Sequence, residues 1–355
     1  MADGFIVRRG GVADATPPPT IKFVSKTEDS VTFTITNNSL KARDITYGLT
    51  TPPTTTTINL AGGATSSNQT ISNITADVVT IFARAEDSAI TEFRVRLEFV
   101  FDPADLSPQL WLDAADATTI TESSGDVSQW NNKGSLGNFT QGTGSLQPKT
   151  GVTTLNSLNV IDFNSDRLVS TNTNEWKFMH DGTKYELFSV VKFGTSSNPN
   201  AFYTLIGNDG GNSANHGFRL FYDDRSGSSK NDVINFGVSR GVGGAFAVLN
   251  ETANDYYTPN QFAILSVYAD PSNATAADRS EIRTNGNSLV KNNTSTNAVS
   301  TSNPSTALVI GAFADGGLPL VGSIAEMIVI SGANVTSGNR TDIINYLADK
   351  WGITI

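Results

Sequence analysis

The chain contains few residues that could form a catalytic centre. It has two histidines, His180 and His216, and no cysteine, and neither histidine accompanies a Gly-x-Ser-x-Gly motif of the kind found in serine hydrolases. A glycoside hydrolase needs two carboxylates that flank the scissile bond. Glu281 and Glu326 instead stand alone in separate predicted strands, where a solvated outer-face position is the simplest interpretation. The sequence therefore predicts no catalytic residue and a protein that is not an enzyme.

Two oxygen-rich loops could hold calcium, which takes six to eight oxygen ligands. The first contains Asp209, and the second contains Asp223 and Asp224. Neither loop has EF-hand spacing, and Asp and Asn in glycine-rich loops usually form turns. We therefore expect no cofactor, with calcium at these three carboxylates as the alternative.

A sugar-binding site would need aromatic side chains next to amide and carboxylate groups on loops. Two segments meet this description, and their candidate residues are Asn212, His216, Tyr222 and Asp223 in one, and Asp255, Tyr256 and Tyr257 in the other. Because Asn254 to Asn260 is a polar run, at least one of its two tyrosines should be exposed. A tyrosine pair is also common at protein contacts. Trp130, by contrast, is expected to be a buried core residue.

The N-terminal residues 1–19 are predicted to be an anchor arm followed by a proline spacer. Phe5, Ile6 and Val7 would anchor the arm on a partner, and Arg8 and Arg9 would pair with acceptors there. The alternative is an arm that folds back onto its own chain. Pro17-Pro18-Pro19 is a stiff polyproline segment that marks a domain boundary.

Composition and charge exclude two classes of partner. The net charge is −10, most of it after residue 102, and an acidic surface repels nucleic acid and anionic membranes. No span approaches the roughly 20 apolar residues of a membrane helix. Phe5-Ile6-Val7 is too short for the core of a signal peptide. We therefore expect no nucleic-acid binding, no membrane insertion, and folding in a cytosol.

Alternating apolar residues predict an all-β chain with two domains. Residues 20–102 read as about seven short strands, residues 103–108 as a proline-punctuated linker, and residues 109–355 as a larger β-domain. A helix is expected from Asn339 to Ile355, with Thr341 as its cap, Gly352 as its stop, and an apolar stripe of Ile343, Leu347 and Trp351.

Motifs at both ends of the larger domain resemble those of one known family. The run LWLDAAD from Leu110 to Asp116 and the pattern R-x-x-I-x-x-Y-L-A-x-K-W-G from Arg340 to Gly352 resemble the start and end of concanavalin A-like (LamG-like) jelly-roll domains. The segment PPPTIKFVSKTEDSVTFTITN is similar to the start of an immunoglobulin-like or fibronectin type III module, although the usual buried tryptophan is absent. The resemblance implies an immunoglobulin-like sandwich followed by a concanavalin A-like jelly roll with a short C-terminal helix.

Modular chains of this kind resemble bacteriophage virion proteins, namely capsid decoration proteins, head fibres and tail fibres. The resemblance implies a non-enzymatic structural protein of the virion surface, assembled in the host cytoplasm and attached to capsid or tail through its arm. Its lectin-like domain would contact host-surface glycans, and a homo-oligomer, in particular a trimer, would be expected. The alternatives are a bacterial carbohydrate-binding adhesin and a polysaccharide-degrading enzyme, because such sandwiches host several functions.

Overall fold

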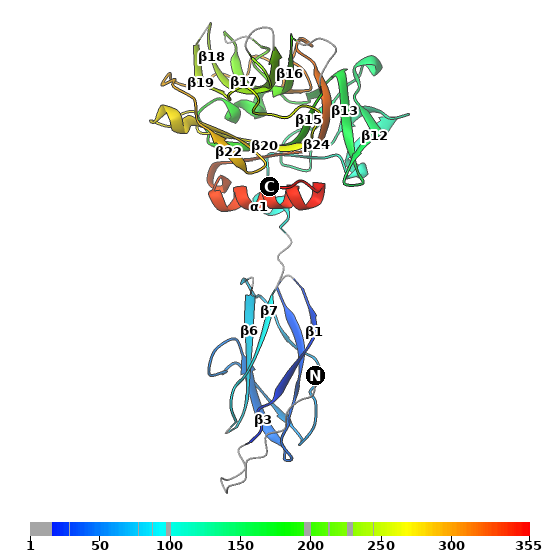
Figure 1. Cartoon of the computed structure of the whole chain (residues 1–355), viewed down its shortest axis with the longest axis vertical. Helices are drawn as coiled ribbons and strands as arrows, with labels where there is room; N and C mark the ends of the chain where they lie inside the picture. Colours follow the sequence, from blue (N-terminus) through cyan, green and yellow to red (C-terminus); the bar gives the residue numbers. More distant parts are fainter. Residues whose placement is uncertain are drawn as a thin grey trace. The chain divides into compact units, whose positions relative to one another are not determined.

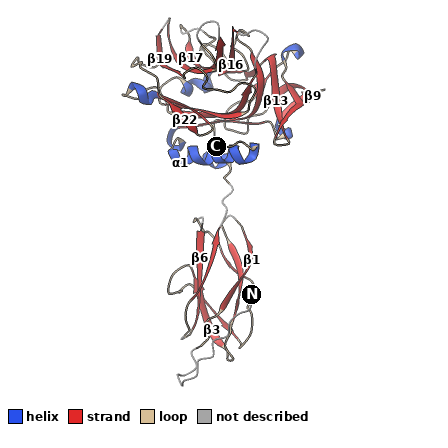
Figure 2. Cartoon of the chain, viewed as in Figure 1, coloured by secondary structure: helices blue, strands red, loops and turns tan. Residues whose placement is uncertain are grey.

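The computed structural model describes residues 16–27, 29–76, 78–86, 88–96, 101–194, 200–211, 214–225, 230–243 and 245–355. The chain divides into two compact units, Met1–Val100 and Phe101–Ile355. Strands dominate both units, and the helical segments are few and short apart from one helix near the C-terminus (Figure 2). The expected all-β fold is confirmed.

The first unit is a sandwich of two antiparallel sheets. One sheet contains β1 (Thr20–Lys26), β2 (Val31–Thr36) and β5 (Gln69–Ile71), and the other contains β4 (Thr56–Leu60), β3 (Arg43–Gly48), β6 (Val78–Ala85) and β7 (Thr91–Arg96). Alternate residues of both sheets face one apolar core. Phe33 of β2 and Tyr47 of β3 meet edge to face across this core, with ring centroids 5.4 Å apart.

The second unit is built from two larger antiparallel layers (Figure 1). We call one layer the front sheet; its strands, in order of pairing, are β19 (Ala245–Glu251), β18 (Val233–Val242), β17 (His216–Arg225), β16 (Asn200–Gly207), β23 (Val309–Ile310), β14 (Leu168–Ser170), β11 (Phe139–Thr140), β10 (Asp126–Trp130) and β9 (Ile120–Ser123). The other layer is the back sheet; its strands, in order of pairing, are β22 (Asn287–Val290), β21 (Ser280–Thr284), β20 (Ala263–Ala269), β15 (Tyr185–Phe193) and β24 (Leu320–Ser331). Two strands, β8 (Leu110–Asp113) and β13 (Leu158–Asp166), then pair one after the other along the far edge of β24, and β12 (Lys149–Leu155) pairs with β13. The layers join where Asp126 of β10 pairs with Lys149 of β12.

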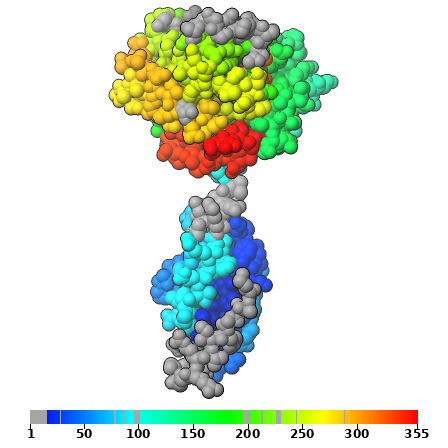
Figure 3. Space-filling model, viewed as in Figure 1, coloured from blue at the N-terminus to red at the C-terminus, as the bar shows by residue number. Residues whose placement is uncertain are grey.

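Two apolar cores hold this unit together. The larger core fills the space between the sheets and contains Trp130, which is fully buried as expected. The second core lies between the back sheet and helix α1 (Ser337–Trp351). One side of α1 remains at the surface (Figure 3).

Helix α1 begins earlier than the sequence suggests. Its cap is Thr336, whose hydroxyl oxygen accepts a hydrogen bond from the Asn339 N–H at 3.1 Å. Thr341 is not the cap: it lies inside the helix, and its hydroxyl donates to the Ser337 carbonyl at 3.0 Å. The other expectations are confirmed, because the apolar stripe is buried and Gly352 ends the helix with a left-handed φ of 66°.

The segment expected to be a linker belongs to the second unit. Pro103–Leu106 form a 3-10 helix capped by Asp102. The Leu106 carbonyl accepts a hydrogen bond from Asn334 at 2.7 Å, and Phe101 and Leu106 pack against the core beneath α1. Residues 103–108 are therefore fixed to the jelly roll, because the apolar side chains around them are buried there. In the described part of the chain, no helix is long and apolar enough to cross a membrane.

Candidate functional site

The two family-like motifs meet in one buried polar cluster. Glu326 of β24 is completely buried, and its carboxylate accepts four hydrogen bonds. Its four donors are Trp111 Nε1 at 2.7 Å, Tyr346 OH at 2.9 Å, Lys350 Nζ at 2.7 Å and Trp351 Nε1 at 2.7 Å. Glu326 is therefore not the solvated outer-face residue that the sequence suggests. We call this arrangement the Glu326 cage.

The Glu326 cage ties the first strand of the unit to its last helix. Lys350 also lies 2.8 Å from Asp113 of β8, and Lys133 lies 3.4 Å from Asp113 and 3.0 Å from Asp116. A hydrogen bond from Thr118 and the neighbouring Lys133 lower the pKa of Asp116. Burial and the neighbouring Asp113 raise the pKa of Glu326. Because both carboxylate oxygens accept hydrogen bonds from β8 and α1, the cage fastens these two elements to β24.

Glu281 has a structural role as well. Its carboxylate oxygens lie 2.9 Å from a guanidinium nitrogen of Arg283 and 2.8 Å from Lys291 Nζ. Arg340, 3.7 Å from Glu281, also lies 2.6 Å from the fully buried Glu186. Burial acts to raise the pKa of Glu281, but the hydrogen bonds from Lys291 and Arg283 outweigh it, and the pKa is lowered. This carboxylate is therefore ionised and paired.

The outer side of the front sheet carries a different kind of surface. Along β17, Phe218, Leu220 and Tyr222 point into the core, so Arg219 and Phe221 lie on the opposite side. The same alternation applies to the neighbouring strands in the layer remote from α1 (Figure 1). We define the front face as the partly exposed side chains there: Phe202, Arg219, Arg225, Lys230, Phe246, Leu249 and Glu251.

Arg219 lies at the centre of the front face between two aromatic rings. Its guanidinium carbon is 4.6 Å from the ring centroid of Phe246 and 5.9 Å from that of Phe221. Nη1 donates to the Gly211 carbonyl at 3.1 Å, and Nε lies 3.5 Å from Asp209. Burial lowers the pKa of Arg219, but the guanidinium stays charged, and 14% of the side chain is exposed.

A second arginine–aromatic pair lies beside the first. The guanidinium carbon of Arg225 is 3.8 Å from the ring centroid of Phe202. Arg225 donates twice to the buried Asp223, at 2.8 Å each, and Phe202 meets Phe221 edge to face at 5.2 Å. These buried partners fix the exposed groups in position, which is how a binding surface is preorganised.

The edge of the front face is also fixed. The β19 strand would leave unpaired backbone groups at the sheet edge, and polar side chains from residues 292–297 cover them. Ser295 and Asn297 donate to the Phe246 carbonyl at 2.7 and 2.9 Å, and Asn293 accepts from the Leu249 N–H at 2.9 Å. Phe246 and Leu249 are therefore held in place on a strand edge that is closed by its own chain.

Aromatic, guanidinium, carboxylate and amide groups thus share one surface. Asn235 donates to Glu251 at 2.9 Å, and Glu251 also pairs with Lys230. Aromatic rings provide apolar area, and the polar groups provide directional hydrogen bonds. The front face therefore offers apolar contact area together with directional hydrogen-bonding groups.

Most of the predicted glycan-binding residues do not form this surface. Tyr222 is fully buried, with its ring stacked on Phe193 at 4.9 Å and its hydroxyl donating to Asp232; burial raises the pKa of its hydroxyl far above the usual range. Tyr257 is 1% exposed and donates to the Gln261 carbonyl at 2.6 Å. Tyr256 is half-buried. The expectation that at least one of this pair is exposed is met only in part by Tyr256, because the hydroxyl of each tyrosine donates to a backbone carbonyl inside the fold.

The remaining candidates are scattered. The half-buried His216 shares a hydrogen bond of 2.7 Å with Ser300, and the exposed Asp255 accepts one from Asn231 at 2.5 Å. Among the predicted glycan-binding residues that the structure describes, Asp223 alone supports the front face. Asn212 lies outside the described residues, as does the whole predicted docking segment, Phe5, Ile6, Val7, Arg8 and Arg9.

Two of the three calcium candidates, Asp209 and Asp223, are engaged with protein groups. Asp209 is completely buried and accepts from the Gly211 N–H at 2.8 Å and from Ser239 at 2.7 Å, and Asp223 is paired with Arg225. Burial and the neighbouring Asp232 and Asp223 raise the pKa of Asp224. Over the ranges that the structure describes, no three His, Cys, Asp or Glu residues are grouped for metal binding.

No protein-family model and no curated protein matches the chain. Among solved structures it is similar to the IT-sialidase CBM40 of Ruminococcus gnavus bound to α2,3 sialyllactose (15% identity, 46% of this chain and 82% of that chain, TM-score 0.34). It is also similar to the botulinum neurotoxin serotype D binding domain (14%, 71% and 56%, TM-score 0.40).

A third similar structure is the sialidase of Trypanosoma rangeli in complex with the inhibitor DANA (9% identity, 92% of this chain and 49% of that chain, TM-score 0.43). All three TM-scores lie below 0.5, so the function is inferred below from the side chains of this chain.

Proposed function

We propose that this chain is a non-enzymatic adhesion protein whose jelly roll contacts glycans through the front face. The observation that carries the proposal is the placement of Arg219 between Phe221 and Phe246, with Asp209 and Gly211 holding its guanidinium. The partly exposed ring of Phe246 can receive the apolar side of a sugar, and the buried ring of Phe221 supports Arg219 from below. The partly exposed polar groups can bind the sugar hydroxyls.

The state of the carboxylates supports a binding role over a hydrolytic one. Glycoside hydrolysis needs one carboxyl group that donates a proton and a second carboxylate that is available as base or nucleophile. Glu326 and Asp223 are occupied by several donors each. Glu251 on the front face is paired with Lys230 and Asn235. The protein's own donors thus engage all three carboxylates, which favours a structural role for them over a catalytic one.

We also propose that the protein is located on a bacteriophage virion. Many copies on one particle would then combine weak glycan contacts into a strong overall attachment. This part is supported by the sequence resemblance: an arm with Phe5 to Arg9, a proline spacer, and display domains on one chain. Attachment to capsid or tail, a trimeric assembly and a virion-surface location belong to the same proposal. A bacterial adhesin is the second candidate, and the front face would serve it equally.

A glycan array probed with the full chain tests the binding role. We expect selective retention on a subset of glycans, reduced by Phe246→Ala. Incubation with the retained polysaccharides should release no reducing sugar. Release of reducing ends by the wild-type chain, or an array on which the chain binds nothing, would remove the proposed function.

A further inference from the structure

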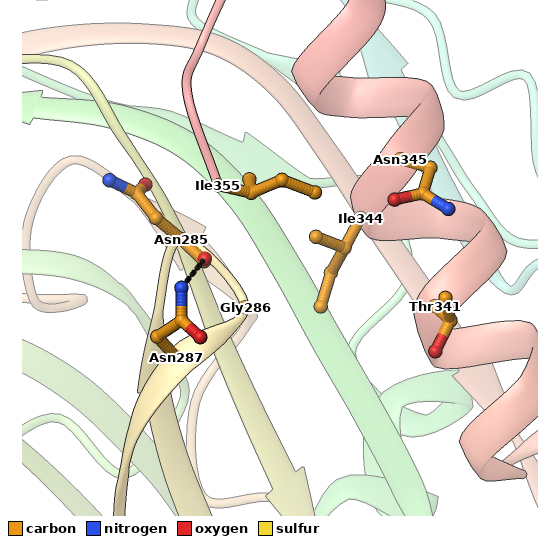
Figure 4. Close-up of a pocket in the computed structure, with 7 residues that line it drawn as sticks. All are labelled: Asn285, Gly286, Asn287, Thr341, Ile344, Asn345 and Ile355. Carbon is orange, nitrogen blue, oxygen red and sulfur yellow. Dashed lines mark hydrogen bonds between the residues drawn. The ribbon is translucent and has the colours of Figure 1, made fainter.

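A separate hollow lies on the helix side of the jelly roll. It is bounded by the turn between β21 and β22 on one side and by α1 on the other, and it has a volume of about 330 Å³. This is at the lower end of the roughly 300–1,000 Å³ range of small-molecule sites. Its lining residues are Asn285, Gly286, Asn287, Thr341, Ile344, Asn345 and Ile355 (Figure 4).

The turn that forms one wall is held rigidly. Asn285 exchanges two hydrogen bonds with Ile264 of β20, through its N–H at 2.8 Å and its side-chain oxygen at 2.9 Å. Gly286 has a left-handed φ of 73°, and a Cβ there would lie 3.3 Å from Ile344 Cγ2. The turn thus packs closely on the helix, and the hollow is preformed.

The walls offer hydrogen-bonding capacity that the protein does not use. Asn287 donates to the Asn285 carbonyl at 3.1 Å, which leaves its side-chain oxygen available as an acceptor. Thr341 donates to Ser337, so its oxygen can still accept. Asn345 is exposed on α1, and its amide makes no hydrogen bond to any described residue. The side chains of Ile344 and Ile355 lie between the turn residues Asn285 and Asn287 and the helix residues Thr341 and Asn345 (Figure 4).

We propose that this hollow binds a neutral hexopyranose unit. Amide and hydroxyl groups match sugar hydroxyls, which both donate and accept, and the isoleucines can cover the apolar side of a ring. The residues that line the hollow carry no charged side chain, and the acidic chain disfavours anions. The site is distinct from the front face, since the back sheet and the main core separate α1 from β16–β19 (Figure 1).

Two sugar sites on opposite sides of one domain would allow a single copy to bridge two glycan chains. On a particle that carries many copies, a glycan held at one site would raise the effective concentration of glycan at the other site of each copy. This consequence rests on the proposed function, whereas the hollow itself does not.

Saturation-transfer NMR with the full chain and the methyl α-hexopyranosides of glucose, galactose and mannose tests the proposal. We expect transfer to at least one of them in the wild-type chain. Asn345→Trp should fill the hollow from an exposed helix position and weaken that binding at least tenfold. The matched variant Asp342→Trp, also exposed on α1, and the front-face variant Phe246→Ala should retain it.

Each other outcome decides against the hollow. Absence of transfer from all three glycosides would overturn it, as would equal binding by Asn345→Trp and wild type. Loss of transfer in Phe246→Ala alone would show that the sugar binds at the front face. That result would support the proposed function and would contradict sugar binding in the hollow. Thermal melting of Asn345→Trp at the wild-type temperature confirms that the variant is folded.

Discussion

Replacing Glu326 by glutamine gives the sharpest test of the Glu326 cage. Glutamine has nearly the same shape, but only one of its two terminal atoms can accept hydrogen bonds. Trp111 and Tyr346 donate to one carboxylate oxygen, and Lys350 and Trp351 donate to the other. In either orientation of the amide, two of the four donors would face an NH2 group.

The expected loss of stability follows from the two donors that lose their acceptor. A buried donor without a partner costs about 1–3 kcal/mol, and breaking a buried ion pair from one side costs about 3–5 kcal/mol. Lys350 would keep its contact with Asp113 at 2.8 Å, so we expect a loss of about 3–5 kcal/mol of unfolding free energy for Glu326→Gln. At about 2–4 °C per kcal/mol for a domain of this size, the melting temperature of the second unit should fall by about 6–20 °C.

Differential scanning calorimetry measures this shift, and the transition of the first unit is an internal reference. Glu122→Gln is the matched control, because Glu122 is exposed and its carboxylate accepts a hydrogen bond from the Gly125 N–H at 2.6 Å; its effect should stay within about 0.5 kcal/mol. Equal shifts in melting temperature for the two variants would refute the claim that the Glu326 cage stabilises the packing of β8, β24 and α1.

Three further predictions concern single residues. Thr336→Ala should cost about 1 kcal/mol by removing the helix cap, whereas Thr341→Ala should stay within about 0.5 kcal/mol in urea titration; the reverse order would restore Thr341 as the cap. Gly352→Ala should cost about 1–2 kcal/mol in the same assay because of its left-handed φ of 66°, and an unchanged midpoint would contradict this. Burial lowers the pKa of His180 below 6.5, so the stability that His180 contributes is full above pH 6.5 and is lost as the pH falls toward the folded-state pKa. His180→Gln should therefore lessen the drop in melting temperature between pH 7 and pH 5. An identical drop in wild type and variant would contradict this prediction.

The architecture was accessible from the sequence because its signals are local or lie in motifs. Strand alternation, the stripe of Ile343, Leu347 and Trp351, and the stop at Gly352 all depend on neighbours within a few residues. The sequence points to Thr341 as the cap, and this is wrong, because two threonines lie close together at the start of the helix. The choice of Thr336 depends on where the preceding chain is held, and Asn334 is held by Leu106, which is distant in sequence.

The candidate site was missed because it depends on strand register. Arg219 pairs with Gly237, and Ser239 of the same strand pairs with Phe246, which brings Arg219 and Phe246 together across β18. No local pattern reports this placement. Tyr257 was misplaced for a related reason: its hydroxyl reaches the Val191 carbonyl at 3.0 Å, a partner in a strand that lies far away in the sequence.

The central claim is that the front face contacts glycans, and a matched pair of leucines tests it most directly. Leu249 on the front face is 41% exposed, and Leu289 on β22 of the back sheet is 46% exposed. The measurement is the affinity of Leu249→Glu and Leu289→Glu for the glycan that the wild-type chain retains best on the array. We predict at least tenfold weaker binding, about 1.4 kcal/mol, for Leu249→Glu alone. Equal affinities of the two variants would contradict the claim.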